Sequence, residues 1–182
     1  MQSQAHPLEP FFQHEVSQIF EGKLGLNDPE LTSYVARVLC QFSEEGSLFL
    51  KRGPGGHAYD ELLAMMKAAD PIFGTAPSFD AERAIRKYVG DYALFVAGMV
   101  PEAIGEETAD TARQPTMGEL IHAGKESYHI VSQFNIFEYK KEAALFARLS
   151  EQFERYTLGL ALVREELSKR LSGPSNSPLQ FS

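Results

Sequence analysis

The feature that most constrains the fold is an apolar stripe in the C-terminal part of the chain. Between residues 136 and 171, apolar side chains recur at steps of three or four residues: Leu145, Leu149, Phe153, Tyr156, Leu160, Val163, Leu167 and Leu171. This spacing places them on one face of an α-helix. A continuous helix of this length would span roughly 50 Å at 1.5 Å per residue. We therefore expect a long last helix that either supports the other helices centrally or forms half of a dimer seam.

The rest of the chain also shows helical spacing, and no stretch alternates with the period of two that a β-sheet needs. Apolar positions, together with start and stop signals, predict further helices over residues 8–21, 29–45, 59–69, 78–99 and 115–133. The sequence therefore predicts a single all-α domain, a bundle of five to six helices, over residues 8–171. We expect a flexible tail over residues 1–7 and a disordered tail over residues 172–182.

Local capping signals indicate where two of these helices begin. Asp28 followed by Pro29 is typical of a helix N-cap and first helical position, because proline lacks the N–H that would otherwise be unpaired there. Asn135, with Glu138 three residues later, is close to a capping box at the start of the last helix.

Composition and charge exclude several classes of protein. A chain of 182 residues is long enough to bury a core without disulfides or structural metals. Its net charge of −8 argues against binding a nucleic-acid backbone. The single cysteine, Cys40, excludes an internal disulfide and fits a reducing compartment. The longest apolar run, residues 92–101, is half the length of a membrane span, and the N-terminus lacks a signal-peptide pattern. We expect an acidic, cytoplasmic protein that binds neither membranes nor nucleic acid.

Residues 119–129 contain two copies of Glu-x-x-His, formed by Glu119 with His122 and by Glu126 with His129. This motif supplies metal ligands in di-iron carboxylate bundles. On a helical wheel, however, the four side chains form one stripe opposite the apolar face. A di-iron bundle directs ligands from several helices into its core, and no further Glu-x-x-His occurs in the chain. We favour a solvated helix face with no metal and no cofactor; the alternative is a metal-binding, di-iron-like enzyme that uses this face.

Asp91 is the one charge in the otherwise apolar second half of the predicted helix 78–99. A buried carboxylate must be hydrogen-bonded or paired, because burial without partners is strongly unfavourable. One interpretation is structural: Asp91 accepts hydrogen bonds from backbone N–H groups or from a tyrosine hydroxyl of a neighbouring helix. The other is functional: Asp91 anchors a small apolar or aromatic ligand in a pocket lined by Tyr92, Phe95 and Tyr128. The sequence leaves both open.

The same helix carries a face of small residues. Gly90 and Gly98 are eight residues apart, and Ala93 and Ala97 lie between them. Together they predict a face that another helix can approach closely.

The stretch "GDYALFVAGMVPEAI", followed some twenty residues later by "AGKESYHIVS", resembles a family of bacterial all-helical proteins with no assigned activity. The family pattern runs roughly Gly-Asp-x-x-Leu-Phe-x-x-Gly-x-x-Pro-Glu and has a later element with glycine and tyrosine. The resemblance covers about residues 30–170, and only the first motif is specific. It implies a shared core of Gly90, Asp91, Leu94, Phe95, Gly98, Pro101, Gly124 and Tyr128. The pattern does not require histidine at positions 122 or 129.

The function that the sequence favours is binding rather than catalysis. No nucleophile–base pair, acidic dyad or glycine-rich phosphate loop stands in a convincing context, so no catalytic residue is nominated. We expect a non-enzymatic helical binding or interaction module that binds a protein partner or itself, as a monomer or homodimer. The alternatives are the metal-binding enzyme on the Glu119–His129 face and a binder of a small apolar or aromatic ligand near Asp91.

Overall fold

The computed structural model describes residues 6–51, 64–68, 74, 77–105 and 114–173. Within these residues the protein is all-α, as the sequence predicts, and the only β-type pairing is an isolated bridge between Gly105 and Thr116. None of the described helices is long and apolar enough to cross a membrane. The two predicted tails lie almost entirely outside the described residues.

The helices with defined bounds are α1 (Glu9–Gly22), α2 (Pro29–Lys51), α4 (Phe79–Met99), α5 (Met117–Gln133), α6 (Lys140–Glu151) and α7 (Phe153–Leu171). Two single-turn 3-10 helices lie between them, η1 (Pro101–Ala103) and η2 (Phe137–Tyr139). Of the helix predicted over residues 59–69, only residues 64–68 are described, and they are helical. The described part of the chain thus has seven α-helical stretches, one more than the upper prediction.

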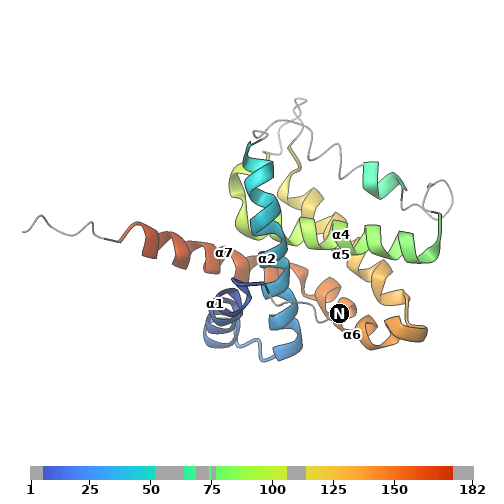
Figure 1. The fold of residues 1–182 in the computed structure, drawn as a ribbon, viewed down its shortest axis with the longest axis horizontal. Coiled ribbons are helices and arrows are strands. Elements are labelled where there is room, and N and C mark those ends of the chain that lie inside the picture. Colours follow the sequence, from blue (N-terminus) through green and yellow to red (C-terminus); the bar gives the residue numbers. More distant parts are fainter. Residues whose placement is uncertain (1–5, 52–63, 69–73, 75–76, 106–113, 174–182) are drawn as a thin grey trace, which may run out of the picture.

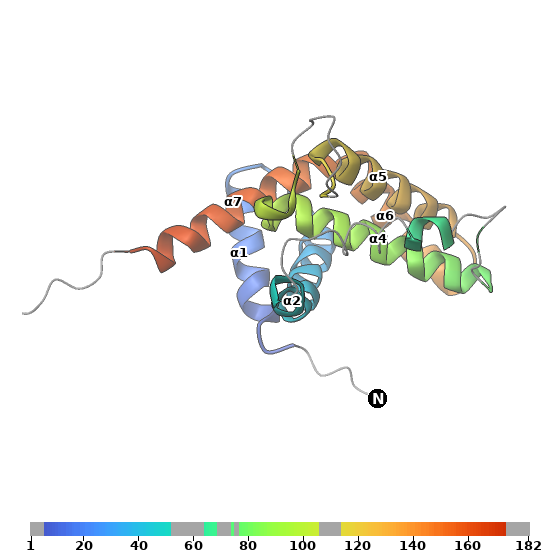
Figure 2. The ribbon, with the colours of Figure 1, turned by 90° about the horizontal axis from the view of Figure 1, so that it is seen from above.

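The helices pack around a central pair. α4 and α5 run side by side in opposite directions (Figures 1 and 2), and α6 covers α5. α7 packs against α4 and α1, while α1 packs against α2. The C-terminal turns of α7 extend beyond the other helices (Figure 1). α7 also contacts α5 and α6, so its N-terminal part lies among four other helices.

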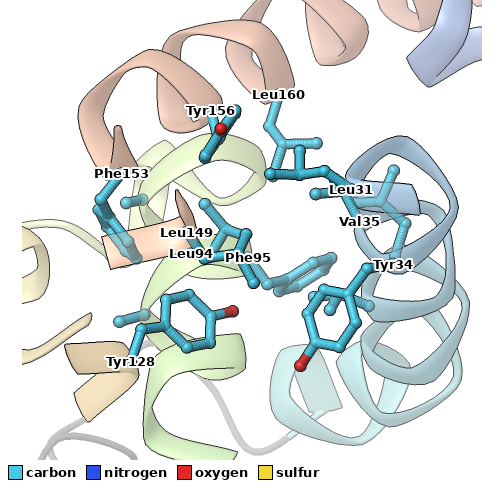
Figure 3. Packing of buried hydrophobic residues seen from close by; sticks show 14 of the residues in the cluster. Leu31, Tyr34, Val35, Leu94, Phe95, Tyr128, Leu149, Phe153, Tyr156 and Leu160 are labelled. Carbon is cyan, nitrogen blue, oxygen red and sulfur yellow. The ribbon is translucent and has the colours of Figure 1, made fainter. Parts of the chain in front are cut away.

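Aromatic and leucine side chains fill the core where these helices meet (Figure 3). The largest fully buried side chains are Tyr128, Tyr156, Phe20, Phe42, Phe146, Phe153, Leu31, Leu39, Leu94, Leu120 and Leu149. Burial of one such side chain stabilises a fold by roughly 1.5–3 kcal/mol, so this cluster dominates the stability of the domain.

The prediction of one continuous last helix over residues 136–171 is wrong. α6 ends at Glu151 and α7 begins at Phe153, and Gln152 between them has φ −114° and ψ 25°, outside the helical region. The apolar stripe itself is real, because its residues from Leu145 to Val163 are buried. α6 lies mainly against α5, whereas α7 lies mainly against α4 and α1. The break lets one stripe serve two different neighbours, which a single straight helix cannot do.

Of the two capping predictions, one is confirmed and one is wrong. The backbone N–H of Leu31 donates to Asp28 Oδ1 at 3.1 Å, and α2 begins at Pro29, so the predicted start of α2 is confirmed. Its predicted end near residue 45 is wrong, because α2 continues to Lys51. A glycine inside a helix costs only about 1 kcal/mol, so Gly46 need not end one.

The predicted capping box of Asn135 and Glu138 is also wrong. Glu138 lies within η2, and α6 begins only at Lys140, after Tyr139 and without a side-chain cap. Phe137 in η2 has a φ of 49°, so this connection turns sharply where the sequence indicated the first helical turn.

The small-residue face of α4 receives two neighbouring helices, as predicted. A Cβ added at Gly90 would lie 2.6 Å from the ring of Tyr128 on α5. A Cβ added at Gly98 would lie 2.4 Å from the Cβ of Leu160 on α7. Both distances are far shorter than any real carbon contact. Glycine at these two positions therefore sets how closely α5 and α7 approach α4.

Most of the core implied by the family resemblance is buried in this structure. Its buried members are Gly90, Asp91, Leu94, Phe95, Gly98, Gly124 and Tyr128. Pro101 is the exception and corrects the expectation: it is exposed, because it begins η1 just after α4 has ended.

Candidate functional site

Asp91 lies at the point where α2 and α5 meet α4. Its side chain is only 1% exposed. Tyr34 of α2 donates its hydroxyl to Asp91 Oδ1 at 2.5 Å, and Tyr128 of α5 donates to the same oxygen at 2.7 Å. Figure 3 shows the two tyrosines coming from different helices with their hydroxyl groups turned toward the same region. The structural interpretation of Asp91, as a carboxylate that accepts a tyrosine hydroxyl, is confirmed.

A lysine completes the arrangement. Lys87, one turn earlier on α4, donates to Asp91 Oδ2 at 2.9 Å. Its side chain is 34% exposed, and its Nζ lies 5.3 Å from the centroid of the Tyr34 ring. The positive charge of Lys87 offsets the negative charge of Asp91, and a cation over an aromatic face adds further attraction. We call Tyr34, Lys87, Asp91 and Tyr128 the Asp91 cluster.

The tyrosines of the Asp91 cluster are held in their neutral form. Burial, followed by the negative charge of Asp91, raises the pKa of Tyr34 well above its ordinary value. The same two causes, in the same order, raise the pKa of Tyr128 well above its ordinary value. A general acid or base at neutral pH needs a pKa near 7, and both tyrosines are shifted away from it. Both hydroxyls are therefore fixed hydrogen-bond donors.

The Asp91 cluster joins three helices through one carboxylate. Oδ1 accepts from α2 and from α5, and Oδ2 accepts from α4 itself. Hydrogen bonds to a charged group are stronger than neutral ones, and a fully satisfied buried network rigidifies the core around it. These hydrogen bonds therefore hold α2, α4 and α5 in one relative position.

The other two residues of the predicted ligand pocket face a different neighbour. The ring of Phe95 stacks on Phe42 of α2 with centroids 5.3 Å apart. The ring of Tyr92 meets the same Phe42 edge-on at 6.1 Å. The structure therefore brings Asp91 and Tyr128 together, and places Tyr92 and Phe95 in an aromatic contact with α2.

Two members of the Asp91 cluster, Tyr34 and Lys87, were not nominated from the sequence. Lys87 carried a readable signal, since it precedes Asp91 by four residues and side chains at that spacing meet on a helix. The sequence indicates Tyr34 as a partner of Asp91 less clearly. Tyr34 lies in the apolar stripe of α2, where its hydroxyl needs a partner once it is buried.

The Glu119–His129 face is open to solvent. Glu119, His122, Glu126 and His129 are all exposed. His122 Nε2 lies 3.9 Å from Glu126 Oε2, too far for a hydrogen bond. Among the described residues, no group of three or more histidine, cysteine, aspartate or glutamate side chains is placed to hold a metal ion.

Glu119 has a structural task that the motif concealed. The backbone N–H of Thr116 donates to Glu119 Oε2 at 2.9 Å, and the backbone N–H of Glu119 donates to Thr116 Oγ1 at 3.2 Å. This is a reciprocal capping box at the start of α5. A carboxylate at this position also interacts favourably with the helix dipole.

A second polar arrangement anchors η2 to the start of α4. Tyr139 donates its hydroxyl to Asp80 Oδ1 at 2.8 Å. The guanidinium of the buried Arg83 lies 4.0 Å from the centroid of the Tyr139 ring, and its Nη2 donates to Glu142 Oε2 at 2.6 Å. The hydrogen bond from Tyr139 to Asp80 raises the pKa of the Tyr139 hydroxyl. These contacts hold the α5–α6 connection in a defined conformation.

Large apolar side chains are exposed around this anchor. Phe79 is 79% exposed, Ile136 is 58% exposed and Phe137 is 85% exposed. The start of α4 and the connection from α5 to α6, to which these residues belong, lie at the end of the molecule away from the projecting turns of α7 (Figures 1 and 2). We call Phe79, Ile136 and Phe137 the apolar end. Sequence reasoning missed it, because residues 136 and 137 fell within the predicted last helix.

No protein-family model, no curated protein and no solved structure matches the chain. The resemblance to the bacterial all-helical family therefore stays an expectation that rests on its sequence motifs.

Proposed function

We propose that the protein is a non-enzymatic helical interaction module that binds through the apolar end, with the Asp91 cluster as its internal brace. The observation that carries this proposal is the exposure and backbone conformation of Phe137. It combines an 85% exposed aromatic ring with a φ of 49°. Positive φ is a genuine outlier for a bulky side chain.

Both properties of Phe137 are unfavourable in an isolated molecule. A residue held in the left-handed region costs on the order of 1–3 kcal/mol, and such residues cluster at ligand-binding and switch sites. An exposed phenylalanine ring contributes no hydrophobic stabilisation to the fold. The adjacent part of the connection is nevertheless held in place, since Tyr139, two residues after Phe137, donates a hydrogen bond to Asp80 and lies under the guanidinium of Arg83. A partner that covers the ring would recover the burial energy that the free molecule forgoes.

The Asp91 cluster supports the same proposal because its contacts suit a structural role rather than catalysis. Its carboxylate already accepts three hydrogen bonds from within the chain. Its tyrosines are poor acids and bases at neutral pH because their pKa values are raised. These properties suit a brace that holds α4 and α5, and thereby positions the residues at their shared end.

The test exploits the backbone of Phe137. Asparagine tolerates the left-handed region far better than phenylalanine does. Phe137→Asn should therefore remove the aromatic ring and leave the free energy of unfolding unchanged or raised. Random peptides displayed on phage and selected on the wild-type protein should lose binding to Phe137→Asn.

Leu171→Ser is the matched control, since Leu171 is 89% exposed at the far end of α7. The selected peptides should bind Leu171→Ser as they bind the wild type. Peptides that bind Phe137→Asn and wild type equally would contradict the proposal. So would a Phe137→Asn variant that lost binding together with its fold, measured by urea unfolding.

A further inference from the structure

We propose that the partner of the apolar end is a second copy of this chain, in a two-fold pair that places the two apolar ends against each other. This inference rests on the proposed function, because it names the partner of the same surface. It is carried by the charge distribution, by the area that the apolar end offers and by its rigidity.

The charge distribution favours self-association at this end. The chain as a whole has a net charge of −8, so two copies repel each other over most of their surfaces. The start of α4, η2 and the start of α6 expose charges of both signs, Lys140 and Lys141 against Asp80, Glu138 and Glu142, whereas Arg83 and Arg86 there are buried and Lys87 is paired with Asp91. Basic and acidic side chains of two copies can therefore meet where the apolar side chains are exposed.

The charges beside Phe137 are also self-complementary. Glu138 precedes Lys140 and Lys141 by two and three residues, and all three are exposed. In a two-fold interface the same patch meets itself, so residue i of one copy faces residue j of the other and the reverse. Such a pair can place Glu138 of each copy opposite the lysines of the other. An unrelated partner would need to match both signs of charge in the same small area.

The area of the apolar end predicts a weak pair. Aromatic side chains of this size bury about 150–250 Å² each, so two apolar ends together offer on the order of 800 Å². Stable interfaces bury about 1,200–2,000 Å², and smaller ones belong to transient complexes. The pair should therefore form reversibly and only at high concentration.

The rigidity of the connection lowers the cost of association. Tyr139 is held by its hydrogen bond to Asp80 and by Arg83 over its ring, so the adjacent backbone is already ordered in the free molecule. A preorganised surface loses less conformational freedom on binding than a mobile one.

The experiment is sedimentation equilibrium of the full chain over a concentration series from about 1 μM to about 1 mM, a range that covers weak affinities. The wild type should pass from monomer toward dimer. Phe137→Asn should raise the dimer dissociation constant by about tenfold or more, as expected for an aromatic residue at the centre of an interface. Leu171→Ser should leave it unchanged.

A charge exchange distinguishes a two-fold pair from other contacts. Glu138→Lys alone and Lys141→Glu alone should each weaken the dimer, because each places like charges opposite one another. The double variant should restore it, because every copy then carries both changes and opposite charges face each other again.

A wild type that stays monomeric throughout, or a dimer unaffected by Phe137→Asn, would overturn the inference. The peptide experiment separates this failure from failure of the proposed function. A monomer whose apolar end still binds selected peptides has a different protein partner there. A monomer whose peptides bind elsewhere contradicts both proposals.

Discussion

Asp91 is the residue whose burial requires most compensation from its neighbours. A carboxylate that is 1% exposed loses nearly all of its hydration, and that loss outweighs most single favourable contacts. Three donors from three helices replace the lost water, and one of them, Lys87, also supplies the opposite charge. Removing any one member leaves the others incompletely paired, so the Asp91 cluster should behave as a unit.

Asp91→Asn should lower the free energy of unfolding by about 2–4 kcal/mol. The side chain keeps its shape but loses its charge, which weakens two strong hydrogen bonds and leaves Lys87 without its partner. The lower half of the range allows for the partial exposure of Lys87. Urea unfolding measures the change.

Asp80→Asn is the control for this substitution, because Asp80 also accepts a tyrosine hydroxyl but is exposed. It should leave stability nearly unchanged. Equal effects of the two substitutions would show that the Asp91 cluster is not a brace.

The raised pKa values of the buried tyrosines predict a loss of stability at alkaline pH. The unfolded chain releases tyrosine protons near the ordinary pKa of 10.0, whereas Tyr34 and Tyr128 keep theirs to well above that value in the fold. Burial likewise raises the pKa of Tyr156 to about 12. The unfolded state therefore binds fewer protons above pH 10.0, and the free energy of unfolding falls as pH rises.

Each tyrosine contributes up to about 1.4 kcal/mol per pH unit to this fall. The stabilising effect is fully present below the ordinary pKa and is lost as pH rises through the folded-state values. Urea unfolding at a series of pH values should give a shallower decline for Tyr34→Phe with Tyr128→Phe than for the wild type. Identical slopes would contradict the burial of the two hydroxyls.

At the scale of elements, the close approach of α4 and α5 depends on Gly90. Gly90→Ala should destabilise the protein by about 1–3 kcal/mol, although alanine favours helix by about 1 kcal/mol. The added methyl group would collide with the ring of Tyr128, which its hydrogen bond to Asp91 holds in place.

Gly22→Ala on α1 provides the contrast, because a Cβ there meets nothing within 4 Å. It should leave the melting temperature unchanged or raise it. A Gly90→Ala variant as stable as Gly22→Ala would mean that the helices can separate without penalty.

Structural elements could be predicted where they depend on residues close together in the sequence. Helical spacing, the Asp28 cap and the small-residue face of α4 act within a few residues, and the structure contains all three. The break at Gln152 has no local signal. The apolar steps continue from Leu149 to Phe153 without a glycine or proline, and only the different neighbours of α6 and α7 explain it.

The candidate site likewise combines features that the local sequence indicates with features that depend on long-range contacts. The need of Asp91 for donors follows from the sequence, and Lys87 could be found from its spacing. The choice of Tyr34 depends on how α2 crosses α4, a long-range contact that no spacing encodes. The apolar end includes Phe137, whose positive φ lies in a stretch where helical spacing predicted a regular helix.

For the whole molecule, the brace and the surface lie on the same pair of helices. The Asp91 cluster fixes α4 against α5, and the anchor of Asp80, Arg83 and Tyr139 lies further toward the end that those two helices share. An acidic molecule thus presents its exposed aromatic side chains at an end that exposes charges of both signs, on a connection that is held by Asp80 and Arg83.

The most direct test of this account is to follow the backbone amide chemical shifts of the wild-type chain from about 50 μM to about 1 mM, where weak contacts become populated. The concentration-dependent shifts should cluster at residues 79–83 and 136–142. Shifts that cluster instead on the exposed side of α7, around Leu158 and Leu171, or that do not change at all, would contradict it.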